Sequence, residues 1–134
     1  MTDSKSTKKI VSTADATPPL PVFSQAVIAN GFVYVSGNIG CDKQFKLAEG
    51  GVQAETRMAL ENISKVLKAA GTSLENVVKV NIYLTNFDRD FAAMNEIYLQ
   101  YFGSDTPPAR TCVGVVTLPF KANVEIECTA ALPD

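Results

Sequence analysis

The sequence contains no histidine among its 134 residues. Without an imidazole, this chain alone cannot supply a Ser-His-Asp triad, a Cys-His dyad or a histidine-ligated metal site. Its three cysteines are widely spaced and form no CxxC pair, so neither a zinc knuckle nor a thioredoxin-type motif is supported. We predict no metal site, and any acid–base chemistry must fall to Glu, Asp, Lys, Tyr or Cys.

Two phosphate-binding motifs are also missing, because the sequence has neither a GxGxxG loop nor a Walker A loop. No apolar run reaches the length of a membrane span, and the net charge of −2 argues against a nucleic-acid-binding surface. The first residues lack the apolar centre of a secretory signal. Together with the odd number of cysteines, these absences predict an intracellular protein with reduced thiols, in the cytoplasm or, as the alternative, in mitochondria.

The composition is that of one globular domain. Hydrophobic residues make up 46% of the chain and charged residues 19%, which is close to the average for folded proteins. Residues 1–8 belong to a Ser/Thr- and Lys-rich start and are expected to form a flexible terminus. Residues 9–134 are expected to form a single domain, since no repeat or low-complexity tract interrupts them.

Apolar spacing and turn signals predict an α+β fold. Strands are expected at 25–29, 32–36, 78–84, 109–116 and 124–131, and helices at 51–70 and from Asn86 or Asp88 to 102. Asn30-Gly31 is a strong hairpin signal between the first two strands. The order ββαβαββ predicts a mainly antiparallel sheet with both helices on one face. Small or apolar residues expected on the other face, such as Gly114 and Val116, favour its burial by oligomerisation.

Six segments of the sequence form a characteristic series when they are taken in order. They are FSQAV (23–27), VYVSGNI (33–39), VVKVNIYL (77–84), DFAAMNEIY (90–98), PPARTCVGV (107–115) and LPFKANVEIECTA (118–130). In this order they resemble the RidA (reactive intermediate deaminase) family from about Lys9 onward. The combination of SG, N-x-x-Y, PAR-[ST]-x-V and LP…VEIE is specific, whereas any one of these elements alone is weak.

The resemblance implies a chorismate-mutase-like fold that assembles as a homotrimer, with active clefts between subunits. It also implies an enzyme of the 2-iminobutanoate/2-iminopropanoate deaminase type. Such a hydrolase converts reactive enamines and imines, for instance 2-aminoacrylate, to 2-keto acids and ammonia without a cofactor. Its partners would be small imino and keto acids and further copies of the chain. No membrane partner is expected, and the net charge of −2 disfavours nucleic acid.

Two residues match the catalytic positions of the family. Arg110 matches the arginine that holds the substrate carboxylate, a role suited to a planar guanidinium fork. Glu125 matches the glutamate that positions water and transfers protons. Alternation places Val124, Ile126 and Cys128 on a core-like face and Glu125 on the opposite one, together with Glu127. The match to VEIE favours Glu125 over Glu127, which is kept as the alternative.

Other matched positions are expected to bind substrate. They are Phe23, Ser36, Gly37, Asn95 and Cys112. Cys112 projects from the same strand face as Arg110 and is not expected to be a nucleophile, because no histidine can activate it. Phe23 departs from the family, in which tyrosine is frequent at this position. The ring is kept, but the hydroxyl that could contact substrate or water is lost.

Two other functional classes stay open at this point. The same cleft could bind a keto acid without turnover and serve as a regulatory module, which the missing hydroxyl at Phe23 favours. A protein- or RNA-directed role, ribonuclease-like or chaperone-like, is the other alternative. The net negative charge and the absence of histidine disfavour ribonuclease chemistry.

Overall fold

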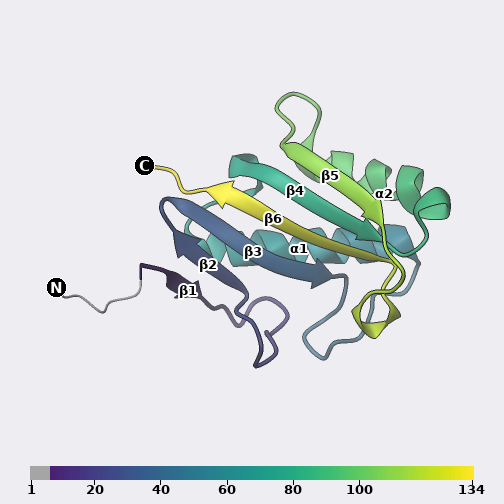
Figure 1. The fold of residues 1–134 in the computed structure, drawn as a ribbon, viewed down its shortest axis with the longest axis horizontal. Coiled ribbons are helices and arrows are strands. Elements are labelled where there is room, and N and C mark those ends of the chain that lie inside the picture. The colour runs from purple at the N-terminus through teal and green to yellow at the C-terminus, as the bar shows by residue number, and fades with distance from the viewer. Residues whose placement is uncertain (1–6) are drawn as a thin grey trace.

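The computed structural model describes residues 7–134, which form a six-stranded sheet and two α-helices (Figure 1). In chain order the elements are β1 (Lys9–Val11), β2 (Ala26–Ala29), β3 (Phe32–Ile39), α1 (Val52–Ala70), β4 (Val77–Leu84), α2 (Phe87–Phe102), β5 (Ala109–Gly114) and β6 (Val124–Ala131). The strand order in the sheet is β1-β2-β3-β6-β4-β5. All neighbouring strands are antiparallel except β4 and β5, which α2 connects as a parallel pair.

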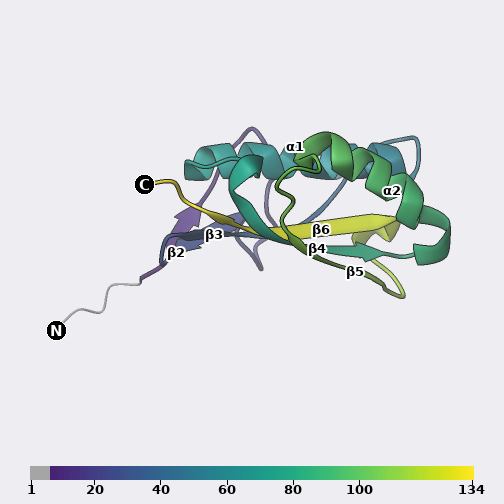
Figure 2. The ribbon, with the colours of Figure 1, turned by 90° about the horizontal axis from the view of Figure 1, so that it is seen from above.

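Both helices cover the same face of the sheet (Figure 2), which confirms the predicted α+β architecture. The buried stripe of α1 recurs at helical spacing through Ala59, Ile63 and Val66, and the helix ends at Gly71 with φ of 95°. At the start of α2, the side chain of Asn86 accepts a hydrogen bond of 3.3 Å from the backbone N–H of Arg89. Asn86 is therefore the N-cap, rather than Asp88.

Local turn and strand signals account for the hairpin strands β2 and β3 and for β6. Asn30 and Gly31 both have positive φ, 52° and 83°, as the two-residue turn between β2 and β3 requires. Val124, Ile126 and Cys128 of β6 are buried under the helices, as the alternation predicted. In residues 7–134, neither helix is long and apolar enough to cross a membrane.

Three strand expectations need correction. The structure adds β1, a three-residue edge strand that follows a polar segment and carries too short a pattern to be recognised. Strand β3 continues beyond residue 36 to Ile39 across a bulge between Val35 and Asn38. Strand β5 ends at Gly114 rather than at residue 116.

The flexible terminus expected at residues 1–8 falls largely on residues 1–6, which lie outside the described residues.

The face of the sheet away from the helices is open, but Gly114 and Val116 do not form it. Gly114 pairs with the buried Leu84, and a Cβ on it would lie 3.3 Å from Cβ of Phe87, so it faces α2. Val116 lies beyond the strand and is exposed. The register instead brings other apolar side chains to the open face, each more than a third exposed. They are Ile10, Phe32, Tyr34 and Val113. An uncovered apolar face therefore remains, built from different residues than the sequence suggested.

Candidate active site

A pocket of about 350 Å³ lies where β3 ends and β6 begins, beside three loops. Its walls come from the segment before β2, the end of β3, the loop after β3, the short helix η2 (Pro119–Lys121) and β6. The lining residues are Thr17, Pro18, Leu20, Phe23, Gln25, Ser36, Gly37, Asn38, Ile39, Cys41, Phe45, Val66, Pro119, Phe120, Glu125 and Glu127. Four of the residues chosen from the sequence thus share this pocket, namely Phe23, Ser36, Gly37 and Glu125, and the alternative Glu127 lines it as well.

The carboxyl group of Glu125 lies directly against the backbone of Gly37. A Cβ atom on Gly37 would come within 2.9 Å of both Cδ and Oε2 of Glu125, closer than side chains pack. Gly37 sits in the bulge of β3, where the extra residue shifts the register against β6. The bulge and the absent side chain together leave room for this carboxyl at the pocket wall.

The environment of Glu125 favours its protonated form. Burial raises the pKa of this carboxyl above its usual value, and the negative charge of Glu127 on the same strand face raises it further. Glu127 is held in place by Asn81, whose Nδ2 donates a hydrogen bond of 3.1 Å to its Oε2. A carboxyl group with a raised pKa exchanges protons closer to neutral pH, as a general acid–base requires.

Phe23 is fixed near Glu125 by the loop before β2. The hydroxyl of Ser36 donates a short hydrogen bond of 2.6 Å to the backbone carbonyl of Ser24, which ties this loop to β3. The backbone N–H of Phe23 closes a turn onto the carbonyl of Leu20 at 3.2 Å. The ring of Phe23 is 42% exposed and contributes an apolar wall to the pocket.

Arg110 belongs to a second group of candidate residues, which lies apart from the pocket, where β5 packs under α2. Its Nη1 donates a hydrogen bond of 2.7 Å to Oδ1 of Asn95, and its guanidinium carbon lies 4.8 Å from the ring centre of Tyr98. The ring of Phe91 lies 5.7 Å away on the same helix. Among residues 7–134 no carboxylate forms an ion pair with Arg110. A guanidinium that is oriented but not neutralised is suited to bind an anionic group.

Cys112 lies on the same face of β5 as Arg110, as the spacing predicted. Burial raises the pKa of this thiol, and the positive charge of Arg110 opposes that shift only in part. The thiol is therefore protonated at neutral pH, which makes it a poor nucleophile. Cys112 is better suited to pack beside the guanidinium than to attack a substrate.

One chain does not bring its two candidate catalytic residues together. Val80 of β4 is paired with Arg110 on one side and with Cys128 on the other, so all three side chains point to the helix-covered face. Glu125 alternates with the buried Ile126 and points to the opposite face. Arg110 and Glu125 thus lie on opposite sides of the sheet, and the sequence alone did not reveal this separation.

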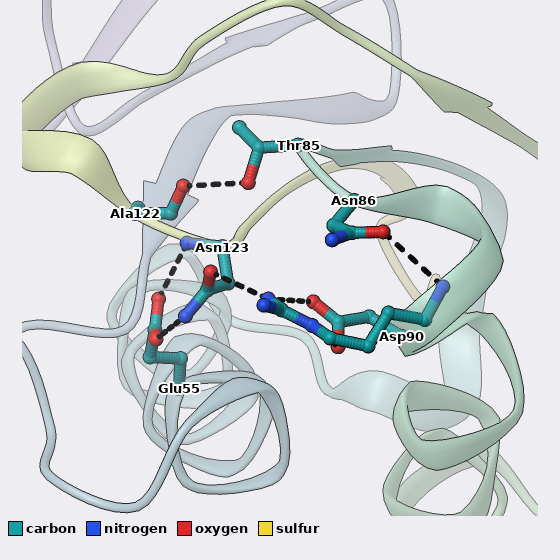
Figure 3. Close-up of polar contacts among 7 residues, drawn as sticks. Glu55, Thr85, Asn86, Asp90, Ala122 and Asn123 are labelled. Atoms are coloured by element: carbon teal, nitrogen blue, oxygen red, sulfur yellow. Dashed lines mark hydrogen bonds and ion pairs between the residues drawn. The ribbon is translucent and has the colours of Figure 1, made fainter.

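A buried carboxylate that we did not predict from the sequence holds the start of β6 (Figure 3). Glu55 of α1 accepts hydrogen bonds from the backbone N–H of Asn123 at 2.8 Å and from its Nδ2 at 2.6 Å. Oδ1 of Asn123 in turn accepts from Arg89, which is paired with Asp90 at 2.8 Å. The network joins both helices to β6 two residues before Glu125. Its one sequence signal is that Glu55 falls on the buried stripe of α1, four residues before Ala59.

Comparisons with known proteins found similar sequences over most of the chain. The sequence matches the family model described as "Endoribonuclease L-PSP" over residues 13–132. A RutC family protein of Synechocystis sp. is 45% identical over 129 residues, which span 95% of this chain and 98% of that protein. A Homo sapiens protein named 2-iminobutanoate/2-iminopropanoate deaminase is 42% identical over 124 residues, which span 92% of this chain and 89% of that protein.

The fold has close structural counterparts as well. The crystal structure of yeast Mmf1 matches with a TM-score of 0.89 at 37% identity, covering 95% of this chain and 100% of that one. Neighbours of this kind have the chorismate-mutase-like fold, which confirms the expectation drawn from the sequence resemblance. The names attached to the relatives differ, since some describe a deaminase and others an endoribonuclease or only a family.

Proposed function

Because the chain belongs to the RidA family, we propose that it hydrolyses reactive enamine and imine intermediates to 2-keto acids and ammonia, without a cofactor. The observation that carries this proposal is the Glu125 carboxyl, which lines a pocket and has a raised pKa. In a chain without histidine, a carboxyl of this kind is a suitable group for moving protons at neutral pH. The deaminase name of the human relative agrees with this chemistry.

We further propose a homotrimer in which Arg110 of one subunit completes the Glu125 pocket of its neighbour. The separation of the two residues on opposite faces of one sheet supports a shared cleft, because no single chain can hold one small substrate between them. Arg110 lies on β5, an edge strand whose outer side is free to meet another subunit. The exposed apolar side chains of the open sheet face provide further surface for such an interface.

The reaction on 2-aminoacrylate needs only proton transfers and one water molecule. A proton adds to the terminal carbon of the enamine and gives an iminium ion. Water then adds to the iminium carbon and loses one proton. The nitrogen gains a proton, the carbon–nitrogen bond breaks, and ammonia leaves with the electron pair, while the hydroxyl group loses its proton and becomes the carbonyl. Each step exchanges a proton with a general acid–base.

Arg110 and Glu125 divide this work. The guanidinium of Arg110 would hold the substrate carboxylate through two parallel hydrogen bonds, which fixes the reacting carbon and lowers the entropic part of the barrier. Glu125 would take the proton from the attacking water and return it to the departing nitrogen. Asn95 orients the guanidinium through its hydrogen bond of 2.7 Å. Phe23, Ser36 and Gly37 would shape the opposite wall around the substrate.

A keto-acid-binding module without turnover is the second candidate, and Phe23 favours it. Its ring lacks a hydroxyl, so this position can pack against a ligand but cannot exchange a proton with it. Such a module would use Arg110 in the same way and would not need the raised pKa of Glu125. The two candidates therefore differ in whether ammonia is released.

A trapping assay separates the two candidates. A serine dehydratase generates 2-aminoacrylate, and semicarbazide present in the mixture converts the remaining imine to a semicarbazone that absorbs in the ultraviolet. The proposed hydrolase should lower the semicarbazone signal in proportion to its concentration while ammonia and pyruvate form earlier. An unchanged semicarbazone signal, together with measurable pyruvate binding, would favour the binding module instead.

A further inference from the structure

Two phenylalanines at the pocket have a left-handed backbone conformation, which is unfavourable for a bulky residue. Phe45 has φ of 63° and Phe120 has φ of 57°, and the adjacent Lys121 has φ of 59°. A side chain with Cβ is strained in this left-handed region, where glycine and asparagine are the usual residues. Bulky residues remain there only when the surrounding structure or a function requires them.

Both strained residues direct their rings to the same place. The ring centres of Phe45 and Phe120 lie 5.7 Å apart with an angle of 18° between the planes, although the residues belong to different loops. Oδ1 of Asp42 accepts hydrogen bonds from the backbone N–H groups of Gln44 and Lys46, at 2.9 and 3.0 Å, and so holds the loop of Phe45. Both rings line the pocket that contains Glu125.

Packing accounts for Phe45, which is half-buried against the apolar cluster of Ile39, Cys41 and Ala122, but not for Phe120. Phe120 is 53% exposed, so its ring buries only part of its apolar surface within the chain. A glycine at the same position would adopt φ of 57° without strain. The strained backbone of Phe120 and its exposed ring therefore make little contribution to the hydrophobic core. Leu20 and Phe23, which are also partly exposed, continue this apolar wall along the pocket.

We infer that this pocket selects 2-imino and 2-keto acids with a large apolar side chain, aromatic or branched, over three-carbon acids. This inference rests on the proposed function for the position of the carboxylate and the reacting carbon. With these fixed between Arg110 and Glu125, the side chain of the substrate would lie against the stacked rings of Phe45 and Phe120. At about 30 Å³ for each water-sized group, the pocket of about 350 Å³ is larger than a three-carbon acid can fill. Contact with aromatic rings stabilises an apolar side chain beyond the area it buries.

Binding of the keto-acid products tests the selectivity without requiring turnover. Titration calorimetry with phenylpyruvate, 4-methyl-2-oxopentanoate and pyruvate should give affinities for the first two at least about tenfold higher than for pyruvate. Equal or weaker binding of the two larger acids would overturn the inference, whatever the protein does to imines.

A pair of variants tests whether Phe120 is the cause. Phe120→Gly removes the ring and accepts the left-handed backbone, so the melting temperature should not fall by more than a few degrees, while the preference for phenylpyruvate over pyruvate should drop to about two- or threefold. Leu99→Ala is the matched control, because Leu99 is also 53% exposed but lies on α2 and does not line the pocket. The control should keep the full preference. If Phe120→Gly keeps it too, the aromatic pair is not the selective element.

Turnover distinguishes this inference from the proposed function. Imines of phenylalanine, leucine and alanine can be produced by an L-amino-acid oxidase with catalase present and followed by the semicarbazide assay. Tight binding of phenylpyruvate without hydrolysis of any imine would reject the deaminase and leave the selectivity intact. Hydrolysis of the alanine-derived imine alone, with no preference in binding, would support the deaminase and reject the selectivity.

Discussion

Gly37 and Glu125 are in such close contact that a single methyl group would separate them, since a Cβ on Gly37 would lie 2.9 Å from the Glu125 carboxyl carbon. Gly37→Ala should therefore displace the carboxyl and lower turnover about 10- to 100-fold, with only a small loss of thermal stability. Gly114→Ala is the control, because it adds the same methyl 3.3 Å from Phe87 and away from the pocket. Comparable turnover in the two variants would mean that the position of Glu125 is not critical.

The raised pKa of Glu125 predicts a pH profile. If its carboxylate takes the proton from water, kcat/KM should fall as the pH decreases through this pKa, at a higher pH than an ordinary glutamate would give. Glu127→Gln removes the nearby negative charge and should move this acid limb to lower pH. Glu125→Gln should abolish the limb and most of the turnover. A limb that stays in place in Glu127→Gln would show that the two carboxyls are not coupled.

Glu125 should also lower the stability of the fold at neutral pH. A carboxyl whose pKa is raised on folding favours the folded state below its unfolded pKa, and this contribution is lost as the pH rises through the folded pKa. Glu125→Gln should therefore raise the melting temperature at neutral pH and have no such effect in acid. Thermal unfolding at the two pH values measures the difference, and a destabilised variant at neutral pH would contradict the assignment.

Arg110 should not tolerate lysine. Lysine keeps the charge but loses the planar fork, the stacking on Tyr98 and the geometry of the bond to Asn95. We expect a loss of about 2–4 kcal/mol of transition-state stabilisation, or roughly 30- to 1000-fold in kcat/KM. Arg57→Lys is a matched control, since Arg57 also lies over a tyrosine ring but is remote from the site. Near-parental turnover in the Arg110 variant would show that this arginine is structural.

Phe23→Tyr should restore a hydroxyl group at the pocket wall. Because Phe23 is 42% exposed, the added oxygen should cause little overpacking. One neutral hydrogen bond contributes about 0.5–1.5 kcal/mol, so turnover of 2-aminoacrylate should rise roughly 2- to 10-fold. A folded variant that binds pyruvate normally but loses activity would mean that the cleft depends on the unmodified ring.

Mixed assemblies test the shared cleft directly. Arg110→Lys and Glu125→Gln subunits, co-expressed with different tags and purified on both, should regain activity that neither variant has alone. If each cleft takes one residue from each of two neighbours, every trimer that carries both tags has one cleft with both native groups, so about a third of the clefts in the purified mixture are complete. No recovery would contradict the shared cleft, and a monomer mass by light scattering would contradict the trimer.

Several features of the fold follow from local sequence alone. Asn30-Gly31 predicts the hairpin because both residues accept positive φ. Alternation along 124–131 predicts β6 with its correct ends and places Glu125 opposite the buried Ile126. The absence of histidine restricts acid–base chemistry to carboxyl, amine, phenol and thiol groups, whatever fold the chain adopts. Each of these inferences depends on a residue type or on a spacing within one element.

Which residues become neighbours in the folded chain depends on contacts between distant segments. Strand order places β5 at the edge and β6 between β3 and β4, and the register of both strands against β4 puts Arg110 and Glu125 on opposite faces of the sheet. Likewise, Phe45 meets Phe120 only because two loops converge beside one pocket. A period of two residues says which face of a strand a side chain occupies, but it contains no information about the neighbouring strand. Pairing between distant strands and the bulge at Gly37 are decided by packing of the whole sheet against its helices.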